Sequence, residues 1–208
     1  MSFVISGCAS FEPALNYSKL TKPREPTVKE TQEGLEVSIE EFVSKDKSKA
    51  AFDAAVAPHG ILALLLRVEN GGTQTYWVRE AGVSAYIGGD SLPSMTGQSA
   101  AKQGTDSGYL GKALLWSLAS GPLTIVPIIV GSVAHTSTVN RRIEAHFESL
   151  SFTESLLKPN QIATGFVYFR LPNGIERLEN LRVEVTSTEE QTGHQLSYKF
   201  TLPTLNLR

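Results

Sequence analysis

The chain has 208 residues, 41% hydrophobic and 19% charged, so it can form an apolar core and is not a globally disordered polymer. A formal net charge of −2 at pH 7, without a cluster of lysines and arginines, gives no basis for nucleic-acid binding. The single cysteine excludes an intrachain disulfide and a thiolate metal site.

That cysteine lies in a recognisable pattern near the N-terminus. Val4-Ile5-Ser6-Gly7-Cys8-Ala9 resembles a bacterial lipobox, in which an aliphatic residue and two small residues precede a cysteine that is lipidated after cleavage. Residues 1–8 therefore read as the remnant of a lipoprotein signal peptide with Cys8 as the lipid attachment site. They lack a basic region, and signal peptides run roughly 15–30 residues, so we expect the start to be truncated. The alternative for Cys8 is a buried free thiol.

Residues 9–34 follow as a segment rich in proline, lysine, glutamate and threonine, with Pro13, Pro23 and Pro26 and little apolar periodicity. This composition is typical of a flexible tether between an anchor and a folded domain. The predicted domain then covers residues 35–208.

The domain is predicted as a series of short strands around one apolar insertion. Alternating or dense apolar patterns predict strands, and Gly, Pro and Asn clusters separate them. We expect a short helix over 45–57, a three-strand meander within 61–87, a mobile polar connection over 88–108, and an amphipathic helix over 137–150. The other predicted strands are 35–40, 162–169, 178–185 and 196–202.

Four segments carry a family resemblance: Gly60-Ile61-Leu62, Val68-Glu69-Asn70, Leu157-Lys158-Pro159 and Gly165-Phe166-Val167-Tyr168-Phe169. They resemble the core-strand pattern of immunoglobulin-like domains in uncharacterised bacterial envelope lipoproteins, where an apolar segment can interrupt the domain. The resemblance implies a mainly β fold with an α insertion, an immunoglobulin-like β-sandwich interrupted by an apolar helical hairpin. It implies no activity and no catalytic residues.

The insertion, expected at about 107–150, contains an apolar block at residues 110–134 with Lys112 as its one charge. The block is long enough for a membrane span of about 20 residues. Strands on both sides could not close one sandwich across a bilayer, however, and Gly121-Pro122 at the centre favours a helix end followed by a helix start. Each arm of about 18 Å is too short for a hydrocarbon core of about 30 Å, so we expect a hairpin in which Pro127 kinks the second arm or marks its first turn.

Three roles for this hairpin remain open. Its arms can cover the sandwich as part of the core, dip into a membrane surface with Trp116 in the headgroup region, or self-associate through small residues such as Gly121. The membrane or self-association candidates are Trp116, Gly121, Pro122, Pro127, Ile128 and Ile129.

Catalytic motifs are missing from the sequence. The four histidines are scattered, and Glu144 and His146 at i, i+2 do not share a helical face. The Ser44…Lys47 spacing matches Ser-x-x-Lys without the other elements of that catalytic set. We therefore expect no catalytic residue, no metal site and no cofactor, and hence no enzyme.

The functional prediction is a lipid-anchored cell-envelope protein, held at the membrane by Cys8, in the outer membrane facing the periplasm. It would act as a non-catalytic binding, scaffolding or assembly module with a partner protein or a second copy, and without nucleic acid. The alternatives are a membrane-inserting or oligomer-forming protein that works through the 110–134 hairpin, and a hydrolase with a site assembled from distant residues.

Overall fold

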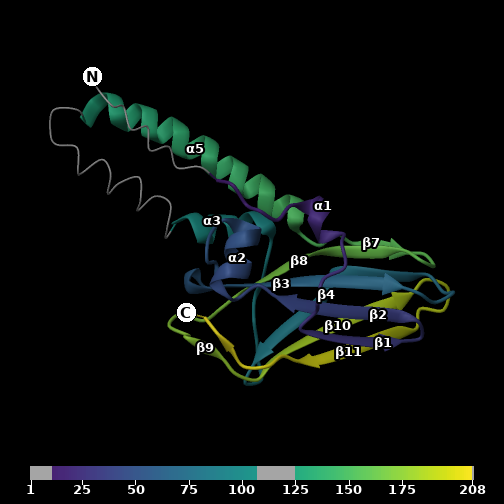
Figure 1. Cartoon of the computed structure of the whole chain (residues 1–208). Helices are drawn as coiled ribbons and strands as arrows, with labels where there is room; N and C mark the ends of the chain where they lie inside the picture. Colours follow the sequence, from purple (N-terminus) through teal and green to yellow (C-terminus); the bar gives the residue numbers. More distant parts are fainter. Residues whose placement is uncertain (1–10, 107–124, 208) are drawn as a thin grey trace.

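A computed structural model of the chain describes residues 11–106 and 125–207, with side chains described for 11–104 and 138–207 (Figure 1). Most of its regular structure is antiparallel β, which confirms the mainly β prediction. The helices are α1 Tyr17–Leu20, α2 Lys45–Phe52, the 3₁₀ turn η1 Ala57–His59, α3 Gly97–Asp106 and α5 Ile125–Leu150. The strands are β1 Val28–Gln32, β2 Leu35–Glu41, β3 Ile61–Asn70, β4 Tyr76–Ile87, β5 Asp90–Ser91, β6 Ser94–Met95, β7 Ser155–Leu157, β8 Ile162–Arg170, β9 Arg177–Leu178, β10 Leu181–Glu189, β11 Gln195–Thr201 and β12 Leu205–Asn206.

Two antiparallel sheets enclose the main apolar core. Sheet A has the order β1-β2-β3-β8-β6, and sheet B has the order β11-β10-β4-β5 with β7 added to β4. Inward side chains of both sheets form one cluster, because alternation along each strand sends every second residue to the same face. Leu35, Val37 and Ile39 of β2 are buried in it, as their alternating pattern predicts.

A second apolar cluster lies on the outer face of sheet A, beneath the helices (Figure 1). Strand β3 is therefore buried on both faces over its first half, which is why its sequence reads ILALLL without alternation. Phe52 of α2 is central to this cluster, with ring centroids 4.6 Å from Phe147 of α5 and 5.0 Å from Phe166 of β8. The molecule thus has three layers: sheet B, sheet A and the helices.

Helix α5 confirms the predicted amphipathic helix over 137–150. The four residues at the predicted spacing, Val139, Ile143, Phe147 and Leu150, are all buried. Its C-terminal half packs on sheet A and α2, whereas its N-terminal half runs beyond the sheets (Figure 1). Pro127 is the third residue of the part of α5 that the structure describes.

The predicted three-strand meander within 61–87 is wrong. Strand β3 belongs to sheet A and β4 to sheet B, so the chain changes sheets at the turn after Asn70. The second and third strands expected in the meander are one strand, β4, with an irregularity in its pairing with β10 between Val185 and Ser187. Gly82 lies at this irregularity, and a Cβ atom there would come 2.7 Å from the Thr186 carbonyl oxygen.

The predicted mobile connection over 88–108 is also wrong for its described part. Strands β5 and β6 and helix α3 occupy it, and Leu92, Met95, Ala100 and Ala101 are buried. Its apolar side chains are few and mostly small, so the composition resembles a loop. Burial of those few side chains against the sheets and α5 is nevertheless enough to order it.

The predicted tether over 9–34 is corrected where the structure describes it, from residue 11. Residues 17–20 form α1, and β1 pairs along its whole length with β2. Leu15 and Leu20 are buried in the helical-side cluster. A few well-spaced apolar residues, together with backbone pairing, fix a segment whose prolines and charges suggested flexibility.

Candidate binding surfaces

The sequence-predicted site residues lie mostly outside the described residues. This holds for the lipid-attachment candidate Cys8 and for Trp116, Gly121 and Pro122 of the apolar block. Pro127, Ile128 and Ile129 lie in the first turns of α5, and the structure describes their backbone alone. No helix among the described residues combines the length and hydropathy needed to cross a bilayer.

The first described residues after Cys8 dock on the helical layer. The ring of Phe11 meets the ring of His146 on α5 edge-on, with centroids 5.3 Å apart. The Glu12 amide donates to the Asp53 carboxylate at 3.1 Å, and the Leu15 amide donates to the Ala50 carbonyl at 2.7 Å. The chain that follows Cys8 is thus attached to α2 and α5 from its third residue onward.

The His146 side chain is half-buried and packs against Phe11 and α2. Its Nε2 lies 2.7 Å from the Ala51 carbonyl oxygen, so this nitrogen carries the proton and donates. The contact joins α5 to α2 beneath the N-terminal segment. This histidine therefore has a structural role, and Glu144 is not its partner in a ligand pair.

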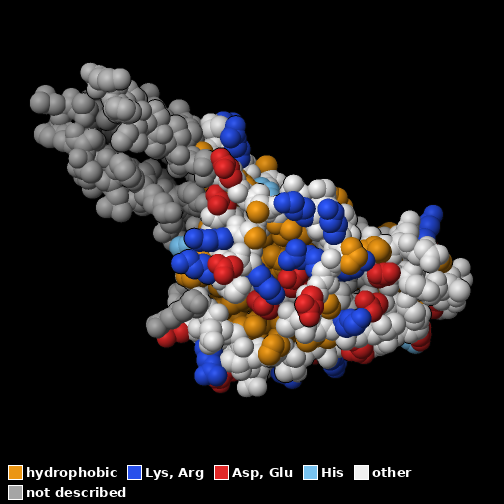
Figure 2. All heavy atoms as spheres, viewed as in Figure 1, with side chains coloured by type: hydrophobic (Ala, Val, Ile, Leu, Met, Phe, Trp, Pro, Cys, Tyr) orange, Lys and Arg blue, Asp and Glu red, His pale blue; other side chains and the backbone are white. Residues whose placement is uncertain are grey.

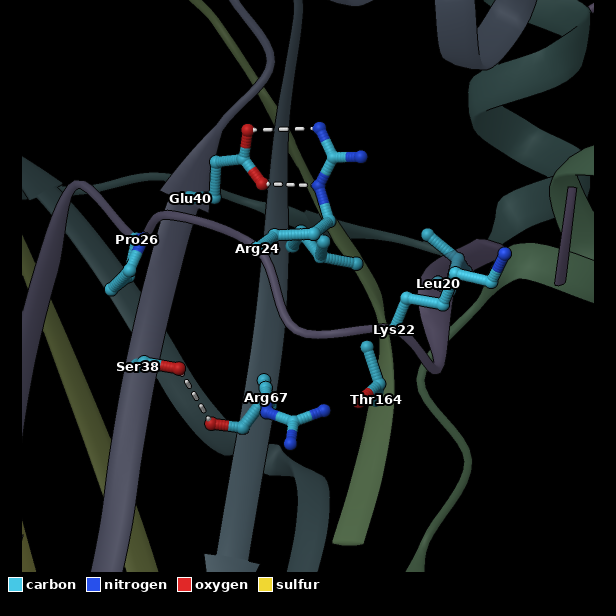
Figure 3. Close-up of a pocket in the computed structure, with 9 residues that line it drawn as sticks. Leu20, Lys22, Arg24, Pro26, Ser38, Glu40, Arg67 and Thr164 are labelled. Carbon is cyan, nitrogen blue, oxygen red and sulfur yellow. Dashed lines mark hydrogen bonds and ion pairs between the residues drawn. The ribbon is translucent and has the colours of Figure 1, made fainter. Parts of the chain in front are cut away.

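Residues 21–27, which we call the strap, cross the polar half of the outer face of sheet A. Arg24 forms a two-pronged ion pair with Glu40 of β2, at 2.6 Å from Nε and 3.1 Å from Nη2 (Figure 3). Lys47 adds contacts of 3.4 Å to Glu40 and 3.0 Å to Glu41. The hydrogen bond to Glu40 raises the pKa of the Arg24 guanidinium, so this cation stays charged.

A small pocket lies under the strap between Leu20, Lys22, Arg67 and Thr164 (Figure 3). Its volume is about 10 Å³, about the room needed for one water molecule. Arg67 Nη1 and Thr164 Oγ1 are buried there and have no hydrogen-bond partner among the described residues. The pocket thus holds these two polar atoms, but it is too small for a substrate.

The chemistry-bearing residues singled out in the sequence have structural explanations. Ser44 is the N-cap of α2, and its side chain accepts from the Lys47 amide at 3.4 Å, which accounts for the Ser-x-x-Lys spacing. Among the described side chains, those of 11–104 and 138–207, no group of three or more His, Cys, Asp or Glu is arranged to hold a metal ion.

A larger cleft opens between the sheets beside β4, and no motif in the sequence indicates it. Residues of β4, of the β5–β6 connection and of β8 line it, and its volume is about 540 Å³. Burial raises the pKa of the Glu80 carboxyl in its wall, and the negative charge of Glu148 adds to this shift. The mixed lining of hydroxyl groups, apolar side chains and one carboxyl suits a binding site.

Lysine, arginine and acidic side chains are interspersed on the face of the molecule drawn in Figure 2. Lysine and arginine side chains gather over the strap and β2, among scattered acidic groups and patches of apolar surface (Figure 2). Many of these cations already pair with carboxylates, as Arg24, Lys29 and Lys47 do. The surface is therefore mixed in charge.

No protein-family model matches the chain, and no curated protein matches it by sequence. Among solved structures, it is similar to YcdA of Bacillus subtilis, with 12% identity and a TM-score of 0.38. The crystal structure of YcdA is described as that of a putative lipoprotein. The similarity covers 86% of this chain and 39% of YcdA, so the chain spans well under half of that protein. At this level the similarity carries no argument about function.

Proposed function

We propose that this chain is a lipid-anchored protein of the bacterial cell envelope whose β domain binds a partner without catalysing a reaction. The observation that carries the proposal is the lipobox-like run Ile5-Ser6-Gly7-Cys8 placed immediately before a folded domain. The proposed membrane is the outer membrane, with the domain facing the periplasm.

We also assign the domain to the immunoglobulin-like class, and the strand order supports this. The constant-type order is A-B-E-D in one sheet and G-F-C in the other. Here β2-β3-β8-β6 and β11-β10-β4 have the same order when these seven strands are lettered A to G along the chain, with β1, β5, β7, β9 and β12 left out as additions. The segment from α3 to α5 then interrupts the connection between the fourth and fifth strands of that scheme, between β6 and β8.

The use of the polar groups near the strap supports binding over catalysis. Glu40 is 7% exposed and its charge is matched by Arg24 and Lys47, so it is a structural anion. The pocket beside it holds about one water molecule. Immunoglobulin-like domains serve many roles, so the proposal rests on these groups and on the anchor, and the fold does not choose among roles.

Lipidation can be tested in the cell of origin. The protein expressed from its own locus is labelled with an alkyne fatty acid, and a Cys8→Ser variant serves as the matched control. We expect label and membrane fractionation for the natural protein and neither for the variant. Equal labelling of both would contradict the proposal.

A second candidate function is membrane insertion or self-association through residues 110–134. It is favoured by one observation: the residues after Cys8 dock on the same helix, α5, that continues out of this apolar block. In a Cys8→Ser background, deletion of residues 113–133 should abolish residual binding to liposomes. Concentration-dependent sedimentation of the undeleted protein would indicate self-association, and unchanged partitioning after the deletion would remove the membrane role.

A further inference from the structure

The β4–β6 cleft, the 540 Å³ cleft introduced above, falls within the size range of protein ligand sites. Its floor is apolar, because Leu92, Met95 and Phe169 line it and are each at most 6% exposed. Its walls carry the hydroxyl groups of Ser84, Ser91, Ser94 and Thr96. Such a lining accepts an apolar side chain together with polar main-chain groups.

One wall of the cleft is a strand edge without a partner strand. On this edge β7 pairs with β4 as far as Val78, and the β5 side begins at Ala85, which accepts from the Leu92 amide at 2.8 Å. Between them, residues 79–84 face no strand in the part of the chain that the structure describes. Unpaired edges of this kind are templates for an added strand.

The irregularity in β4 brings Glu80 to the cleft. Opposite residues 79–82, β10 offers only Thr186 between its two registers, so this part of β4 bulges. Gly82 permits the close approach to Thr186 that the bulge requires. Bulges re-aim side chains next to binding sites, and Glu80 is the charged side chain in the cleft wall.

The Glu80 carboxylate has no ion-pair partner in the described part of the chain. Among the described residues it makes no ion pair or hydrogen bond, and the neighbouring Arg79 is engaged with Glu154 at 3.0 Å. Glu148 adds a second negative charge close by, which is one cause of the raised Glu80 pKa. A bound cation would relieve both the repulsion and the burial cost of the carboxylate.

We propose that the β4–β6 cleft binds an extended peptide segment of a partner protein, with a lysine or arginine on Glu80 and an apolar side chain over Leu92, Met95 and Phe169. The edge of β4 over residues 79–84, which no described strand covers, favours a peptide over a small amine, since a peptide can hydrogen-bond along a strand edge. The proposal deepens the proposed binding role and does not depend on lipidation of Cys8.

The test uses the whole chain carrying Cys8→Ser and a blocked octapeptide, Thr-Val-Thr-Lys-Val-Thr-Val-Thr. Titration followed by backbone amide NMR should shift the resonances of residues 79–84 and 91–96. The same peptide with glutamate in place of lysine should bind at least about tenfold more weakly. A blocked single lysine serves as the small-amine probe and should bind far more weakly than the octapeptide.

Glu80→Gln keeps the shape of the side chain and should weaken binding of the lysine peptide about 5- to 10-fold, as expected for the loss of one charge-assisted contact. Glu36→Gln is the matched control. Glu36 is also half-buried, but it lies on β2, which is separated from β8 by β3 and contributes no residue to the cleft. Shifts elsewhere, equal binding of the glutamate peptide or of the blocked lysine, or an unchanged Glu80→Gln variant would overturn the proposal. Because no lipid is present, failure here leaves the anchoring test unaffected.

Discussion

At the scale of single residues, the strap is held by charge. The Glu40 side chain is 7% exposed and that of Arg24 is 33% exposed, so their ion pair is well shielded on one side. Arg24 also lies over the Phe42 ring, 5.3 Å from its centroid. A shielded carboxylate that loses a partner is costly, because its desolvation is no longer compensated.

We therefore expect Arg24→Ala to lower the free energy of unfolding by about 1–2 kcal/mol, less than a fully buried pair would lose, since Lys47 remains near Glu40. Urea denaturation measures the change. Arg177→Ala is the control: its pair with Glu179 is about 60% exposed on both sides and should change stability by less than about 0.5 kcal/mol. Equal losses would show that the strap pair is no stronger than a surface pair.

The charged Glu80 carboxylate should lower the stability of the folded protein, whereas the Arg24–Glu40 pair raises it. Burial and Glu148 raise its pKa in the folded protein above the unfolded value, so the folded state holds the Glu80 proton more tightly. Its contribution to stability is then fully present below the unfolded pKa and is lost as pH rises through the folded pKa. Glu80→Gln should therefore be a few tenths of a kcal/mol more stable than the natural protein at pH 7, because the site is partly exposed. Denaturation at pH 4 and pH 7 should show this advantage shrinking at the lower pH, and an advantage that is absent at pH 7 would contradict the sign.

Residue-level prediction from the sequence succeeded where a pattern was local. Val139 and Phe147 are buried as members of the helix face that their spacing indicates. Arg24 and Glu80 could not be found in this way. Arg24 pairs with Glu40, 16 positions away, and Glu80 reaches its cleft through an irregularity in β4. The sequence around each residue therefore shows neither the ion pair nor the cleft.

At the scale of elements, the return from α5 to the sheets depends on one glycine. A Cβ atom at Gly165 of β8 would lie 2.6 Å from the Phe152 amide nitrogen, where the chain crosses the strand. The Phe152 amide also donates to the Phe166 carbonyl at 2.8 Å, so the crossing backbone is hydrogen-bonded in place. A glycine inside a strand pattern often marks such a close approach of another backbone segment.

Gly165→Ala should destabilise the protein by about 2–3 kcal/mol, because backbone atoms must move to admit the methyl group. Gly104→Ala on α3 is the control. Its Cβ would meet Ile61 at an ordinary 3.6 Å, so the gain in helix propensity should stabilise the protein by about 0.5–1 kcal/mol. Thermal unfolding of both variants checks the pair, and a neutral Gly165→Ala would mean that the crossing segment can shift.

Helices and strands with a strong apolar periodicity could be predicted from the sequence, whereas those with few large apolar residues could not. Strands β2, β3, β8 and β11 and the C-terminal half of α5 fall where the sequence places them. Strand β1 reads VKETQ and was missed, because only its pairing with β2 defines it. Helix α3 was missed because its buried side chains are the alanines Ala100 and Ala101, which give little contrast with a polar loop.

At the scale of the whole molecule, the sequence predicts the β class but not the layer order. Periodicity cannot tell that β3 and β4 lie in different sheets, since both patterns are equally compatible with adjacent strands. The double burial of β3 was visible as an unbroken apolar run, and it indicates a third layer on sheet A. The prediction of a tether is wrong here because Phe11, Leu15 and Leu20 pack in that third layer.

This packing limits how a lipid at Cys8 could orient the domain. Phe11 is the third residue after Cys8, so the two α-carbons are at most about 10 Å apart, and Phe11 contacts His146 on α5. If Cys8 is lipidated, the helical layer must therefore stay close to the bilayer surface. A cysteine-reactive reagent too bulky to enter the headgroup region should reach sheet B and be hindered at the helical layer.

We accordingly expect slow labelling at Arg142→Cys on α5 and fast labelling at Lys199→Cys on β11 in the lipidated protein in liposomes. Both positions are exposed in the described structure, so the detergent-solubilised protein should label equally at the two. Insertion of a 20-residue Gly/Ser linker between Ser10 and Phe11 should restore fast labelling at Arg142→Cys, because such a linker has a mean span of about 25 Å. Equal labelling without the linker would show that the N-terminal contacts with α5 are released at the membrane.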